Sequence, residues 1–219
     1  MLAESLISNE LIPLQTSDNG STALEMMSDF YVRHLPIVNN KQLLGLISEE
    51  DILDYDVNEA IGSYSLSLIR PYVYRNEHLY EVMRLLADLR LTVVPVVDRD
   101  NNYLGVVTMD DLLQYFSSTY AFREPGSIII LEVNNRDYSL AEIARIAESE
   151  NARILSAFIT SKPDSPIIDV TLKLNRQYIQ NMIATFLRFD YTIKASFNEV
   201  DYLDSLQERY DSLITYLNV

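Results

Sequence analysis

Short apolar runs alternate with amphipathic stretches along the first half of the chain, and polar turns separate them. An amphipathic stretch that Ser21 or Thr22 can cap precedes two apolar runs, and another stretch with a capping residue begins at Ser48. This spacing predicts a helix, two short strands and a second helix. The predicted elements are a leading helix at 1–10, an extended segment at 11–14, a helix ending near residue 30, strands at 35–38 and 43–47, and a helix at 48–55.

The same order returns about 60 residues later. Pro36 and Pro95 are 59 positions apart, and Asp51 and Asp111 are 60 positions apart. Because the self-similarity extends over roughly 50 residues, it indicates an internal duplication rather than one recurring motif. The second copy predicts an extended segment at 68–74, a helix from 79, strands at 93–97 and 103–107, and a helix from 108, with residues 57–67 as the linker.

The second half of the chain follows a different order, which begins after the helix-breaking stretch at 123–126. Apolar strand patterns and helical faces succeed one another as βαββαβ, the order of a ferredoxin-like domain. Strands are predicted at 128–133, 153–160, 168–174 and 191–197, and helices at 140–147 and 179–186. Leu203, Leu206, Tyr210, Leu213 and Leu217 then form a heptad-like stripe that predicts a C-terminal helix.

Composition restricts the function classes. The 219 residues carry a net charge of −15, of which −11 lies in residues 1–124, so binding to nucleic acid or to an anionic membrane is disfavoured. The absence of cysteine excludes disulfides and thiolate metal sites. No apolar run is long enough to span a bilayer and no signal-type segment is present, so we expect a cytoplasmic protein. We predict no metal, because the two histidines, His34 and His78, lie in different copies.

The duplicated motif resembles the cystathionine-β-synthase (CBS) domain pair, or Bateman module. The resemblance rests on residues 34–38 with 45–51 in the first copy and on residues 94–98 with 105–111 in the second. It implies an adenosine-containing ligand in the cleft between the repeats. We expect an α/β fold with CBS repeats at 1–62 and 63–123.

The C-terminal half resembles an ACT-type domain, which we place at 126–200 with a tail helix at 201–219. Ligand-binding members carry a glycine before the first helix, where this chain has Tyr138. A side chain there would block an amino acid from reaching the backbone. A CBS pair followed by an ACT-like domain also resembles acetoin-utilisation-type regulatory proteins.

The residues of the CBS-like motif are compatible with a nucleoside site. Ser48 and Thr108 end strands and begin helices, where their hydroxyls and free N–H groups suit a phosphate. Asp51 and Asp111 lie one turn further on and could accept hydrogen bonds from a ribose diol. The same spacing also describes ordinary helix caps. The candidate cations are Arg33 and His34, with Arg90 close to the matching position of the second copy and Arg70 and Arg75 beside the other entry strand. The complete set of predicted binding residues is Ser48, Asp51, Thr108, Asp111, Ile12, Arg33, His34, Pro36, Ile37, Pro95 and Val96.

These features favour a non-catalytic regulatory protein that binds AMP or S-adenosylmethionine, with AMP favoured, and relays binding to an unidentified protein partner. We expect a homodimer, because both resembled families commonly associate. Two alternatives stay open: an assembly adaptor with empty CBS sites, and an amino-acid sensor acting through the ACT-like half. An enzyme is disfavoured, because no nucleophile elbow or phosphate-binding loop motif is present.

Overall fold

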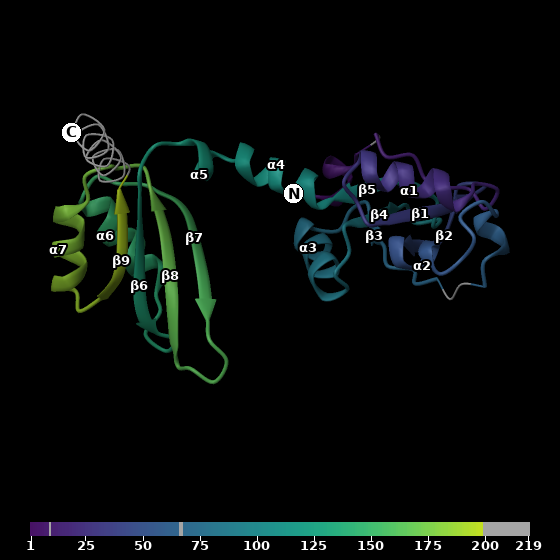
Figure 1. The fold of residues 1–219 in the computed structure, drawn as a ribbon. Coiled ribbons are helices and arrows are strands. Elements are labelled where there is room, and N and C mark those ends of the chain that lie inside the picture. Colours follow the sequence, from purple (N-terminus) through teal and green to yellow (C-terminus); the bar gives the residue numbers. More distant parts are fainter. Residues whose placement is uncertain (9, 66–67, 199–219) are drawn as a thin grey trace, which may run out of the picture. The chain divides into compact units, whose positions relative to one another are not determined.

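The computed structural model describes residues 1–8, 10–65 and 68–198 (Figure 1). The chain divides into two compact units, Met1–Ser117 and the segment from Ser118 onward. Each unit has its own buried apolar core. The predicted tail helix lies outside the described residues, and our domain boundaries stay predictions.

The first unit contains two copies of a helix followed by a β-hairpin and a second helix. The first copy has η1 (Ala3–Leu6), α1 (Gly20–Asp29), β1 (His34–Asn39), β2 (Gln42–Ser48) and α2 (Glu49–Leu53). The second has η2 (Ile61–Ser63), β3 (Val73–Tyr74), α3 (Leu79–Asp88), β4 (Val93–Val97), β5 (Tyr103–Thr108) and α4 (Met109–Ser118). The predicted leading helix is a single 3₁₀ turn, and the extended segment at 68–74 forms a strand only at its end.

The two hairpins repeat each other in register and in their irregularities. β1 pairs with β2 and β4 pairs with β5 in antiparallel fashion, and each pair has a bulge at the same place, after Ile37 and after Val96. A parallel bridge from Leu14 to Ile37 matches the parallel pairing of Val73 with Val96. The duplication that the sequence predicts is therefore confirmed at the level of hydrogen bonds.

The helix that precedes each hairpin ends in the same way. Tyr31 follows α1 and Arg90 follows α3, and both have φ of 52°, in the left-handed region. The next amide in each copy reaches back to the helix: Val32 N–H donates to the Met27 carbonyl at 2.9 Å, and Leu91 N–H to the Leu86 carbonyl at 3.0 Å. These are Schellman endings, in which a left-handed residue turns the chain sharply away from the helix. The turn in the second copy positions Arg90 beside the first repeat's motif.

The second unit is a four-stranded antiparallel sheet with two helices on one face (Figure 1). After the short α5 (Tyr120–Arg123), which we did not predict, the elements follow the βαββαβ order, and the strands lie side by side as β7-β8-β6-β9. This is the ferredoxin-like arrangement that the sequence predicts. The elements are β6 (Ser127–Asn134), α6 (Leu140–Ser149), β7 (Ile154–Ser161), β8 (Ile167–Leu174), α7 (Gln180–Arg188) and β9 (Thr192–Asn198).

Candidate functional site

Each repeat carries a hydrogen-bonded cap where its hairpin becomes a helix. In the first repeat, Ser48 Oγ accepts a bond from the Asp51 N–H at 3.0 Å, while Asp51 Oδ2 accepts from the Ser48 N–H at 2.9 Å and from the Ser48 hydroxyl at 2.6 Å. Thr108 and Asp111 make the same three bonds at 3.0, 2.8 and 2.7 Å. The capping role that the spacing allows is thus present in both repeats.

These capping bonds limit what the motif can offer a ligand. The Ser48 hydroxyl hydrogen already goes to Asp51, and the Glu49 N–H donates to the Arg33 carbonyl at 3.0 Å. The expected phosphate contact through this hydroxyl and the first-turn N–H groups is therefore largely taken up by the protein itself. What remains is Oδ1 of Asp51, which accepts no hydrogen bond from the described residues. A carboxylate oxygen can accept two such bonds, as a ribose diol requires.

A cavity of about 710 Å³ lies between the repeats of the first unit. We call it the first pocket. Its volume is typical of small-molecule sites. It brings together four predicted residues: Arg33, His34, Ser48 and Asp51. Its other lining residues are Leu46, Glu49, Glu50, Ile69, Leu86, Leu89, Arg90, Leu91, Thr92 and Met109.

Charge in the first pocket is close to balanced. Arg33 is paired with two carboxylates of α2, Glu49 at 3.3 Å and Glu50 at 3.5 Å. Arg90 makes no ion pair with any described carboxylate, so its charge is available to a ligand. With Asp51, the pocket holds three carboxylates against two guanidinium groups. This balance suits a ligand with one anionic group better than a polyphosphate.

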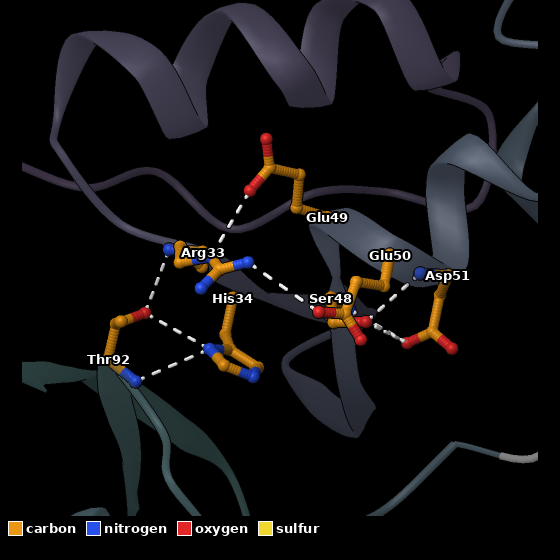
Figure 2. Close-up of polar contacts among 7 residues, drawn as sticks. All are labelled: Arg33, His34, Ser48, Glu49, Glu50, Asp51 and Thr92. Atoms are coloured by element: carbon orange, nitrogen blue, oxygen red, sulfur yellow. Dashed lines mark hydrogen bonds and ion pairs between the residues drawn. The ribbon is translucent and has the colours of Figure 1, made fainter.

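His34 joins the two repeats (Figure 2). Its Nδ1 accepts a bond from the Thr92 N–H at 3.3 Å and lies 3.1 Å from the Thr92 hydroxyl oxygen, which in turn accepts from the Arg33 N–H at 2.9 Å. Burial first, and then the adjacent Arg33 charge, lower the pKa of His34 from its ordinary value, while Asp51 and Glu50 act weakly in the other direction. The acceptor role of Nδ1 towards the Thr92 amide and the lowered pKa both favour the neutral ring at neutral pH, so His34 is a weaker candidate cation than Arg33 or Arg90.

A second, smaller cavity occupies the related position in the other repeat. This second pocket has a volume of about 470 Å³ and includes Thr108 and Asp111. Among the described residues that line it are three carboxylates, of Glu10, Asp110 and Asp111, and no arginine, lysine or histidine. The two copies of the motif therefore face different electrostatic environments.

The remaining predicted residues lie outside these two pockets. Ile37 and Val96 are 1% and 0% exposed and belong to the core, Pro36 and Pro95 are also buried, and Ile12 is 66% exposed. In β1, strand alternation places Ile37 on the face opposite His34, and that odd-numbered face packs into the core. β4 is buried on both faces, so Pro95 and Val96 are both enclosed by the core. The apolar wall of the first pocket instead comes from Leu46, Ile69, Leu89 and Met109.

Comparison with known proteins identifies the duplicated half. A family model of the CBS domain matches residues 3–58 and 68–118. The first unit is a CBS domain pair. The chain is similar to a CBS domain pair/ACT domain protein of Thermotoga maritima, at 19% identity over 53% of this chain and 96% of that one, with a TM-score of 0.48. It is also similar to the Vibrio cholerae protein AcuB, named for acetoin utilization, at 21% identity over 53% and 90% of the two chains, with a TM-score of 0.47.

Among curated relatives, the magnesium transporter MgtE of Thermus thermophilus is 33% identical over 86 residues, which are 37% of this chain and 18% of the transporter. Alignments to the first curated relatives span between 18% and 34% of their lengths. The similarity is thus to a module that occurs in proteins of several kinds.

In the second unit, Tyr138 lies just before α6 and its side chain packs against the core of that unit. Within residues 1–8, 10–65 and 68–198, no group of three or more histidine or acidic residues could hold a metal ion. In the same ranges, no helix has the length and apolar character needed to cross a membrane.

Proposed function

We propose that the CBS pair is a regulatory, non-catalytic module that binds an adenosine-containing ligand in the first pocket. One observation carries the proposal: the unpaired guanidinium of Arg90 and the open carboxylate oxygen of Asp51 line one cavity from opposite repeats. Asp51 Oδ1 accepts bonds from the ribose, and Arg90 pairs with a phosphate. Leu46, Ile69 and Leu89 provide the apolar wall for the base.

The charges favour AMP over ATP. Arg33 is already paired with Glu49 and Glu50, so among the described residues of the pocket lining Arg90 is the guanidinium left to balance an added anion. Each further phosphate would meet the three carboxylates without a matching cation. S-adenosylmethionine, which carries a positive sulfonium, is the second ligand that this charge pattern accommodates.

Regulation would follow because the ligand contacts both repeats. A ligand held by Asp51 and Arg90 stabilises the arrangement in which the repeats face each other, and so shifts the population toward it. We propose that this shift reaches a protein partner through the second unit, and that the chain acts as a homodimer. Both steps rest on the family resemblance.

Calorimetric titration of the full chain with adenosine, AMP, ADP, ATP and S-adenosylmethionine tests the proposal. We expect AMP to bind, and Asp51→Asn to weaken it at least tenfold, because the amide can keep the capping bonds through its oxygen while turning an N–H₂ toward the ribose. Asp111→Asn is the matched control, since it makes the same change in the second pocket. Absence of heat with every nucleotide at millimolar concentration would leave the assembly adaptor as the better explanation.

An amino-acid panel in the same assay separates the remaining alternative. Tyr138 packs against the core of the second unit at the position where the resembled ligand-binding domains carry a glycine, so we expect no amino acid to bind. A saturable signal with an amino acid, unaffected by Asp51→Asn, would identify the second unit as the sensor.

A further inference from the structure

The histidine that makes the contact between His34 and Thr92 has no equivalent in the second repeat. Positions 33 and 34 of the first repeat correspond to Thr92 and Val93 of the second, so the imidazole is present on one side only. Its hydrogen bonds join residues 58 positions apart and lie on the wall of the first pocket. The imidazole ring therefore contributes both to the contact between the repeats and to the wall of the proposed ligand site.

One hydrogen bond indicates which ring nitrogen carries the proton, because the contact with the Thr92 hydroxyl fits either tautomer and the contact with the Thr92 amide fits only one. A backbone N–H can only donate, so the bond from the Thr92 amide makes His34 Nδ1 an acceptor. The Thr92 hydroxyl oxygen accepts from the Arg33 N–H, and its own hydrogen can then go to the same Nδ1. The remaining proton of the neutral ring is on Nε2, the nitrogen that Figure 2 shows directed away from Thr92.

We propose that Thr92 locks His34 as a neutral Nε2–H donor and that this donor selects a ligand carrying a hydrogen-bond acceptor, the phosphate of a nucleoside monophosphate. This inference rests on the proposed function of the first pocket and adds a specificity-determining residue to it. His34 and the unpaired Arg90 line the same cavity, so one supplies a directed hydrogen bond and the other a charge. A ligand group that can only donate hydrogen bonds would find no acceptor in His34 Nε2–H or in the Arg90 guanidinium, and so would be disfavoured.

The charged groups around the ring are consistent with a neutral donor. Five charged side chains line the pocket together with the ring. Two are the guanidinium groups of Arg33 and Arg90, and three are the α2 carboxylates of Glu49, Glu50 and Asp51. Protonating Nδ1 would place an N–H against the Thr92 N–H and abolish the bond between them, leaving Nδ1–H to donate to the Thr92 hydroxyl oxygen instead. The lock therefore holds only while the ring is neutral, as the lowered pKa of His34 favours at neutral pH.

Nuclear magnetic resonance tests the lock without any ligand. The chain has only two histidines, so a long-range ¹H–¹⁵N correlation spectrum contains two ring patterns, and His78→Gln removes one of them. We expect His34 to show a single neutral Nε2–H pattern at pH 7.5. A ring protonated on Nδ1, or a mixture of the two neutral forms, would overturn the lock.

Two substitutions of His34 separate the lock from ligand selection. His34→Asn keeps an acceptor near the Nδ1 position and loses the distal donor, whereas His34→Gln can supply a distal N–H but loses the Nδ1 acceptor. We expect His34→Asn to weaken AMP about tenfold, the effect of one lost hydrogen bond to a charged group, and to leave adenosine binding unchanged. His78→Gln is the control and should bind AMP like wild type.

Each result decides a separate point. Equal affinity of wild type and His34→Asn for AMP would overturn the selective role of His34 even if the spectrum shows the lock. If AMP fails to bind wild type, the proposed function of the pocket is refuted and the selection with it, while the spectrum alone still decides whether Thr92 fixes the ring.

Discussion

Replacing Arg90 with glycine should stabilise the CBS pair while impairing its ligand site. Arg90 has φ of 52° in the Schellman ending of α3, a conformation that costs a residue with a side chain about 1–2 kcal/mol relative to glycine. Glycine also increases the entropy of the unfolded chain, by roughly 0.5–1 kcal/mol. The net expectation for Arg90→Gly is a gain of about 1 kcal/mol, because its guanidinium makes no ion pair with a described carboxylate.

Tyr31→Gly is the matched control. Tyr31 has the same φ of 52° at the end of α1, is 94% exposed and does not line the first pocket. Both variants should raise the urea midpoint followed by circular dichroism, and a gain of about 1 kcal/mol corresponds to a rise of roughly 4 °C in the midpoint of thermal unfolding. Only Arg90→Gly should weaken AMP, by about tenfold, while leaving adenosine unchanged.

Two results would refute this reasoning. If Arg90→Gly destabilises the protein while Tyr31→Gly stabilises it, the Arg90 side chain makes a structural contribution that outweighs the strain of its backbone. If both variants bind AMP like wild type, the charge of Arg90 takes no part in binding, and the phosphate must be recognised elsewhere.

Three further predictions follow from the geometry. Ser48→Ala removes the cap and should cost about 1 kcal/mol of stability, measured by urea unfolding. It should change AMP affinity less than threefold, whereas Asp51→Asn should reduce the affinity more. An equal loss of affinity in both variants would mean that the Ser48 hydroxyl binds the ligand. Because folding lowers the pKa of His34, the neutral ring contributes stability that is complete above about pH 6.5 and is lost as pH falls toward the folded pKa. The midpoint of thermal unfolding should therefore fall more between pH 7.5 and 5.5 in wild type than in His34→Asn. Parallel pH profiles of the two proteins would contradict this prediction. Gly126→Ala should destabilise the second unit by about 3 kcal/mol, measured by circular dichroism during urea unfolding, because its Cβ would lie 1.9 Å from the Leu174 carbonyl oxygen; an unchanged midpoint would show that the strand can shift at no cost.

The elements of both halves could be predicted from the sequence because their periodicities are strong. β8 alternates buried and partly exposed positions along its whole length, as Ile168, Val170, Leu172 and Leu174 indicate. The duplicated hairpins could be found because the turn between apolar runs and the Ser/Thr-x-x-Asp cap recur together. These local signals determine the order of elements, and the ferredoxin-like sheet follows from that order.

The lining of the pocket could not be predicted equally well. β4 is buried along its whole length, so its pattern does not show which face meets a ligand. We predicted Ile37 and Val96 as binding residues, and both are buried in the core. Arg90 was named as a nearby cation but not included among the predicted binding residues, because its position depends on a left-handed turn that the sequence pattern does not indicate.

The divergence of the two repeats argues that the first pocket, rather than the duplicated motif as such, is the functional feature. Both copies keep the Ser/Thr–Asp cap, and capping alone explains its presence twice. The two pockets differ in the side chains beside the cap: Arg90 and His34 line the first, whereas the described lining of the second contains carboxylates and no basic side chain. A purely structural duplication would not need this difference. The cap supplies a carboxylate in both repeats, and we propose that Arg90 of the opposite repeat and His34 of the same repeat allow a phosphate to bind only beside the first.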